Sequence, residues 1–175
     1  MSTSTAPTAF GEIHVIQPST THTHTIVFLH GRGSTGKVFA DELFDTIAND
    51  DHQVSAVTAI NLFPSMRWVF PSSRSQWDKT FEEYMPAWFE APSLADISVG
   101  RDAQAPGIRD AVIYINRLLE DEIMKLGGHS EKLFLGGISQ GGATAMLALL
   151  SRGYEGEPRL GNNFHRFAGF LAASA

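Results

Sequence analysis

The chain has 175 residues, of which 43% are hydrophobic and 18% charged, as in an ordinary globular protein of one domain. Its net charge of −6 and its lack of any basic run argue against a nucleic-acid partner, because such binding needs clustered Lys and Arg. The absence of cysteine excludes disulfides, thiolate catalysis and thiolate metal sites.

The N-terminal region lacks targeting features. Residues 1–31 contain no Lys or Arg and no long apolar stretch, which argues against secretory, mitochondrial and membrane-spanning segments. Residues 1–10 are rich in Ser, Thr, Pro and Ala and are expected to form a loose tail. Residues 11–175 are expected to form a single domain of a cytoplasmic protein with no membrane span.

Strand and helix patterns alternate through the first half of the chain. A short strand is expected at 13–16 and a buried one at 25–30, followed by a helix that Ser34 or Thr35 can cap. Both 54–60 and 67–70 have strand composition, and we favour 67–70 as the strand of the sheet. Residues 71–105 are longer than a simple connection and are predicted to be a functional loop.

The second half continues the alternation. Apolar residues at helical spacing predict a helix over 108–126, which Gly127 and Gly128 would end. A strand over 133–138, a helix after it and a last strand at 167–173 complete the pattern. The sequence therefore predicts an α/β fold with a mostly parallel sheet and helices on both faces.

The junction of the last strand–helix pair carries the strongest chemical signal. Gly137-Ile138-Ser139-Gln140-Gly141 fits a nucleophile elbow, in which a serine lies on a strained turn between strand and helix. The flanking glycines avoid clashes where backbone segments crowd together. Ser139 is thus the candidate nucleophile. The alternative is a serine that only caps the following helix.

Three motifs in one consistent order carry a resemblance to a known family. The motifs are Leu29-His30-Gly31-Arg32-Gly33, Met85-Pro86-Ala87-Trp88-Phe89-Glu90 and Gly137-Ile138-Ser139-Gln140-Gly141-Gly142. With them, the chain resembles the acyl-protein thioesterases and carboxylesterases, which are α/β-hydrolases, over about residues 12–175. The family usually has Leu where Arg32 stands and Asp where Glu90 stands.

The resemblance implies a serine hydrolase that needs no cofactor and no metal. Ser139 would attack an ester or thioester carbonyl to form an acyl-enzyme, and the backbone N–H groups of Arg32 and Gln140 would stabilise the oxyanion. The substrate would be an S-acylated protein, a lysophospholipid or a small ester. The aromatic cluster between residues 68 and 89 would include an acyl-binding wall, with Trp88, Phe89, Met85 and Trp77 as candidates. For any single one of these aromatic residues, pinning a long loop in place is the more common role, so only the cluster counts as evidence.

Two other motifs suggest different chemistry. Gly31-Arg32-Gly33-Ser34-Thr35-Gly36 fits the dinucleotide-binding pattern of an oxidoreductase, with Asp50 or Asp51 at about the right distance for its acidic partner. These aspartates precede the next apolar run instead of following it, so the oxyanion loop explains the glycines better. His22 and His24 share a strand face but lack a third metal ligand nearby.

The partners of Ser139 in a catalytic triad are missing. Downstream of it lie only Glu155, Glu157 and His165, which a parallel sheet would place at the opposite edge. His52 and His129 fail for the same reason, and only His30 ends a strand at the correct edge. We therefore expect residues 1–175 to be the N-terminal part of a hydrolase, with its last strands and their loops missing and no activity alone. The alternative is a catalytically dead acyl-binding protein.

Overall fold

A mixed five-stranded sheet forms the centre of the computed structural model, which describes residues 9–49, 61–79, 81–91, 100–152 and 166–173. β1 pairs antiparallel with β3, and the other neighbours are parallel. The predicted mostly parallel sheet is thus confirmed. In spatial order the strands are β1 (His14–Ile16), β3 (Met66–Phe70), β2 (His24–Leu29), β6 (Leu133–Ile138) and β7 (Gly169–Ala173).

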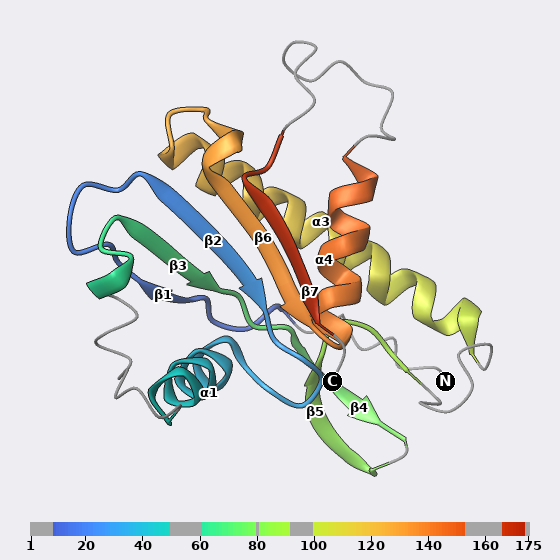
Figure 1. Ribbon diagram of the computed structural model, residues 1–175. Coiled ribbons are helices and arrows are strands. Elements are labelled where there is room, and N and C mark those ends of the chain that lie inside the picture. Colours follow the sequence, from blue (N-terminus) through green and yellow to red (C-terminus); the bar gives the residue numbers. More distant parts are fainter. Residues whose placement is uncertain (1–8, 50–60, 80, 92–99, 153–165, 174–175) are drawn as a thin grey trace.

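Helices cover both faces of this sheet, as predicted. α1 (Gly36–Asn49) lies on one face, and α3 (Arg101–Lys125) and α4 (Gln140–Ser151) lie on the other (Figure 1). Alternate residues of each strand point to opposite faces. Val27 and Leu135 pack towards α3 and α4, whereas Phe28 and Phe70 pack against Phe39 of α1. The sheet therefore separates two apolar cores.

The segment predicted as a long loop is partly structured. It contains an antiparallel hairpin, β4 (Arg74–Asp78) and β5 (Glu83–Ala87), and the first turns of α3. The hairpin was missed because its side chains are mostly polar or exposed. Trp77 and Tyr84 face each other across it, with ring centroids 5.3 Å apart. Figure 1 shows the hairpin projecting beyond the carboxyl ends of the parallel strands.

The helix α3 begins seven residues earlier than predicted. Pro106 lies inside it, and a proline normally disfavours helical backbone in the residue before it, which is why the sequence suggested a later start. The predicted end is confirmed. Gly127 and Gly128 have φ of 71° and 87°, and the Gly128 N–H donates to the carbonyl of Ile123 at 2.9 Å.

The prediction that residues 1–10 form a loose tail is wrong for Phe10. Its ring stacks on Tyr114 with centroids 4.0 Å apart, and the guanidinium of Arg74 lies 4.2 Å from its centroid. An aromatic ring packed in this way belongs to the folded domain. Residues 1–8 and the alternative strand at 54–60 lie outside the described residues.

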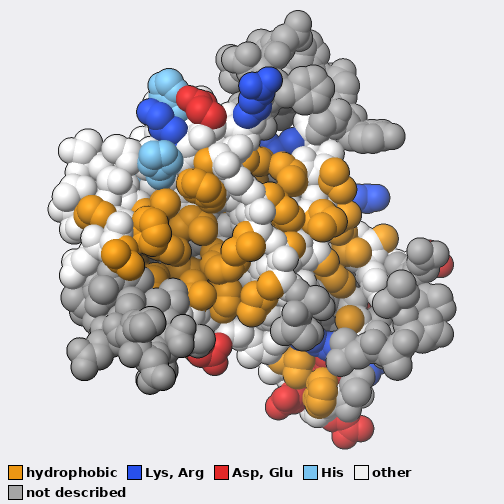
Figure 2. All heavy atoms as spheres, viewed as in Figure 1, with side chains coloured by type: hydrophobic (Ala, Val, Ile, Leu, Met, Phe, Trp, Pro, Cys, Tyr) orange, Lys and Arg blue, Asp and Glu red, His pale blue; other side chains and the backbone are white. Residues whose placement is uncertain are grey.

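Hydrophobic side chains spread over the sheet face beside α1, as Figure 2 shows. β7 is an edge strand among the described residues, and its Leu171 is 58% exposed. Met146 and Leu150 are exposed on the neighbouring α4. No helix in the described part of the chain is long and apolar enough to cross a membrane.

Candidate active site

Ser139 adopts a backbone conformation that residues other than glycine rarely take. It lies between the end of β6 and the start of α4, with φ 50° and ψ −124°. Its side chain makes no capping hydrogen bond to the helix, so the reading of Ser139 as a simple helix cap is wrong. A strained residue that the surroundings hold in place is typical of functional sites.

Glycines allow the close backbone contacts that hold this turn. A Cβ at Gly141 would lie 2.3 Å from the carbonyl oxygen of His30, and one at Gly137 would lie 2.5 Å from the carbonyl carbon of Gly141. A Cβ at Gly31 would lie 3.6 Å from that of Ser139. The loop after β2 is therefore packed directly beside Ser139.

His30 is fully buried at the end of β2 and supports this loop. Its Nδ1–H can donate to the carbonyl of Gly31 at 2.6 Å, while Nε2 accepts the backbone N–H of Ser73 at 3.0 Å. Burial lowers the pKa of His30, which favours the neutral ring that this pairing requires. Both ring nitrogens are occupied, so His30 does not serve Ser139 as a substitute base.

Trp88 and Gln140 join three segments beneath the site. The Trp88 indole N–H donates to the carbonyl of His30 at 2.8 Å, and its backbone N–H donates to Oε1 of Gln140 at 2.8 Å. The Gln140 amide donates in turn to the carbonyl of Phe89 at 2.8 Å. Trp88 is only 1% exposed, so it supports the site from inside and is not the acyl-binding surface that the sequence suggested.

Sequence reasoning predicted a role for the backbone N–H of Gln140 but missed the role of its side chain. The available signal was a long polar residue next to glycines on a turn expected to be buried. Such a residue needs hydrogen-bond partners.

Three of the four predicted acyl-contact residues do come together. Trp77, Met85 and Phe89 line a cavity of about 410 Å³ that also contacts Arg32 and Asp78. Trp68, which the sequence grouped with them, packs instead against Phe44 and Phe70 in the core beside α1. The aromatic cluster thus splits between this cavity and the core.

The glycines of the dinucleotide-like motif have structural explanations. A Cβ at Gly36 would lie 2.0 Å from the carbonyl oxygen of Phe70. The Gly36 N–H donates to Oγ of Ser72 at 2.9 Å, and the Val38 N–H donates to Oγ1 of Thr35 at 3.3 Å. A phosphate would need such first-turn amides free, so the geometry disfavours nucleotide binding here. Asp50 and Asp51 lie outside the described residues.

The other histidines lie away from Ser139. His22 and His24 bond to Thr25 and Thr23, and the described residues contain no group of three side chains that could hold a metal. His129 pairs with Glu131 before the amino end of β6. His52, Glu155, Glu157 and His165 are outside the described residues.

One histidine was overlooked at the carboxyl edge of the sheet. His14 pairs with Phe70, at the carboxyl end of β3, because β1 runs antiparallel. It lies three strands from β6, which corresponds to about 14 Å at a strand spacing of ~4.8 Å. That distance is beyond hydrogen-bond reach of Ser139.

Comparisons with known proteins agree with this geometry. Residues 11–155 match the family model described as Phospholipase/Carboxylesterase. Acyl-protein thioesterase 1 of Schizosaccharomyces pombe is 30% identical over 139 residues, which are 78% of this chain and 54% of that protein. Acyl-protein thioesterase 1 of Cryptococcus neoformans is 26% identical over 137 residues, 78% of this chain and 52% of that protein. The chain spans about half the length of these curated relatives.

Solved structures show the same fold. The crystal structure of Zea mays acyl-protein thioesterase 2 matches with a TM-score of 0.61 and 25% identity, over 93% of this chain and 61% of that one. The Bacillus cereus carboxylesterase matches with a TM-score of 0.54 and 12% identity, over 92% and 58%, which is a likeness of fold alone. Since the family model covers most of the residues described above, the chain belongs to the phospholipase/carboxylesterase family of α/β-hydrolases.

Proposed function

We propose that this chain supplies the nucleophile and the oxyanion site of a hydrolase that cleaves carboxylic esters or thioesters. The observation that carries the proposal is the conformation of Ser139, with φ 50°, at the N-terminus of α4 and beside Gly31. This is the arrangement in which a serine hydroxyl is exposed above a sheet and close to backbone donors.

In the proposed reaction, Oγ of Ser139 attacks the carbonyl carbon and the carbonyl oxygen becomes an oxyanion. The backbone N–H groups of Gln140 and Arg32 would donate to it, and the dipole of α4 favours negative charge at the same end. Each donor is worth about 3 kcal/mol in the transition state. Collapse of the intermediate expels the alcohol or thiol, and water then hydrolyses the acyl-enzyme.

The general base is not assigned to any described histidine. His30 uses both ring nitrogens, and His14, His22, His24 and His129 lie away from Ser139. Loss of the base of a serine triad lowers turnover by about 10⁶. The same observation favours a second candidate for residues 1–175, which is acyl binding without turnover.

The proposed substrates follow from the cavity beside Arg32. The apolar side chains of Trp77, Met85 and Phe89 offer a surface for an acyl chain. The acceptor would be a protein thiol, a lysophospholipid or a small alcohol, and the similar proteins named acyl-protein thioesterase favour the thioester.

A fluorophosphonate probe tests the proposal, because it reacts with activated serines. We expect labelling of the wild-type chain that disappears in Ser139→Ala and persists in Ser34→Ala, a control in the neighbouring loop. Rapid labelling would support a hydrolase, and slow labelling with retained binding of the probe's alkyl chain would support the acyl-binding candidate. Labelling that survives Ser139→Ala would overturn the assignment of the nucleophile.

A further inference from the structure

The side chain of Arg32 lines the cavity and contacts the β4–β5 hairpin and the segment that follows it. Its guanidinium forms an ion pair with Asp78 at the end of β4. It also donates to the carbonyl of Ala91 at 3.4 Å and lies 6.0 Å from the ring centroid of Phe81 in the hairpin turn. One residue of the loop beside Ser139 therefore touches the turn end of the hairpin and the segment after β5.

Two further contacts reinforce this link. Oδ1 of Asp78 accepts the backbone N–H of Phe81 at 3.2 Å, so the same carboxylate holds the turn and Arg32. The backbone N–H of Gly33 donates to the carbonyl of Pro86 on β5 at 2.8 Å. The loop after β2 is thus attached to both strands of the hairpin.

The ion pair is poorly suited to a purely stabilising role. The side chains of Arg32 and Asp78 are only 15% and 4% exposed, and Nε of Arg32 is buried without a hydrogen-bond partner. Burying charges costs free energy that the pair repays only when every donor is satisfied. What such a pair does provide is a fixed geometry between the two segments that it joins.

We propose that the Arg32–Asp78 ion pair is a latch that holds the hairpin against the loop beside Ser139 and limits the acyl groups that the cavity accepts. An acyl chain that lies along Trp77, Met85 and Phe89 meets this polar pair at the cavity wall. Covering the pair with methylene groups would remove its remaining hydration. Short chains fit with the latch closed, whereas long chains require it to open. The choice of acyl group rests on the function proposed above, and the latch itself does not.

Hydrogen exchange measured by mass spectrometry tests the latch without any catalysis. Asp78→Asn removes the charge while keeping the shape, and we expect amide exchange in residues 81–87 to rise at least tenfold. Asp110→Asn is the matched control, because it breaks the Arg74–Asp110 pair at the opposite end of β4, where N and O are 2.8 Å apart. Equal exchange of residues 81–87 in both variants would overturn the latch.

Alkyl fluorophosphonates with chains of 2 to 16 carbons test the acyl limit, with labelling followed by intact mass. We expect wild type to label well with short chains and at least tenfold more slowly with the longest. Asp78→Asn and Arg32→Leu should move this limit to longer chains, and Asp110→Asn should not. An unchanged limit would overturn the acyl part of the inference. No labelling at any length would overturn the proposed hydrolase, while the exchange experiment still decides the latch.

Discussion

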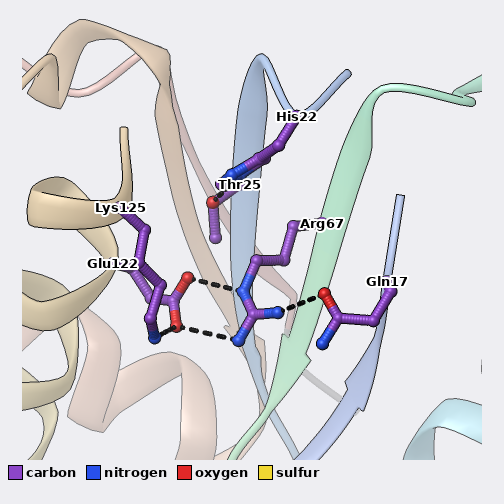
Figure 3. A network of polar contacts seen from close by, with 6 residues as sticks. All are labelled: Gln17, His22, Thr25, Arg67, Glu122 and Lys125. Carbon is purple, nitrogen blue, oxygen red and sulfur yellow. Dashed lines mark hydrogen bonds and ion pairs between the residues drawn. The ribbon is translucent and has the colours of Figure 1, made fainter. Parts of the chain in front are cut away.

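The two edges of the parallel sheet are held together by different forces. At the carboxyl edge, Ser139 and His30 are fixed by close backbone contacts and by hydrogen bonds between neutral groups, and the Arg32–Asp78 ion pair joins the adjacent loop to the hairpin. At the amino edge, Glu122 of α3 accepts from Arg67 of β3 at 2.8 Å and from Lys125 at 2.5 Å (Figure 3).

The ion-pair network of Glu122 thus lies at the edge of the sheet away from the proposed chemistry. A carboxylate bonded to the backbone N–H groups beside Ser139 would compete with an oxyanion for these donors, whereas the carboxylate of Glu122 at the far edge ties α3 to the sheet. In open α/β sheets, ligands bind beyond the carboxyl ends of the strands. The amino edge can therefore be altered to change stability without touching the site.

The largest expected effect is at the amino edge. Glu122 is 1% exposed, and Glu122→Ala would leave Arg67 poorly paired, which should lower the free energy of unfolding by about 3 kcal/mol. Urea denaturation measures this loss. Asp41→Ala is the control, because its pair with Lys37 is exposed and should contribute at most about 0.5 kcal/mol. Equal losses would contradict the role given to the buried network.

A glycine substitution at the carboxyl edge should cost nearly as much. Gly141→Ala would press a Cβ against the His30 and Leu29 carbonyls, and rigid backbone cannot yield, so we expect a loss of about 2–3 kcal/mol. Gly33→Ala has open space around its Cβ and only a φ of 82° to accommodate, at a cost of about 1 kcal/mol. Similar urea midpoints for the two variants would mean that crowding does not hold the turn.

The pH dependence of stability should differ between the edges. Burial lowers the pKa of His30, so the unfolded chain takes up a proton as pH falls through about 6.5 before the folded chain does. Stability is then complete above that pH and falls below it by up to about 1.4 kcal/mol per pH unit. His30→Gln should flatten the profile. In the half-buried His22, burial and then the charge of Arg67 lower the pKa, so His22→Gln should flatten it less. A pH profile that is flattened more by His22→Gln than by His30→Gln would contradict the assignment of this pH dependence to His30.

Much of the fold could be predicted because its signals are local. The apolar run of β2, the elbow at Ser139 and the glycines after α3 each contain their own evidence within a few residues. The hairpin β4–β5 could not be found in this way. Its alternation is polar and its one conspicuous pair, Trp77 with Tyr84, becomes visible only when the strands are aligned.

The candidate site was predicted at the backbone level and missed at the side-chain level. The turn at Ser139 follows from its glycines, but the contacts of Gln140 with Trp88 and of Arg32 with Asp78 join residues about fifty positions apart. The helical and strand periodicities of a sequence do not indicate contacts between residues so far apart. The burial of Trp88 was also hidden, since a tryptophan in an apolar stretch of a predicted long loop suits a core and a binding surface equally.

The smallest effect concerns the strain at Ser139 itself, which has no counterpart among the described non-glycine residues of the amino edge. Glycine tolerates φ 50° with ψ −124° better than residues with a Cβ, so Ser139→Gly should be about 1 kcal/mol more stable than Ser139→Ala. Ala143→Gly, on the exposed side of α4, is the matched control and should lose about 1 kcal/mol through ordinary helical backbone. If Ser139→Gly were less stable than Ser139→Ala, as glycine is in an ordinary helix, the turn would store no strain. If Ser139→Gly is the more stable variant, the protein gives up stability at the position where the proposed chemistry needs the hydroxyl.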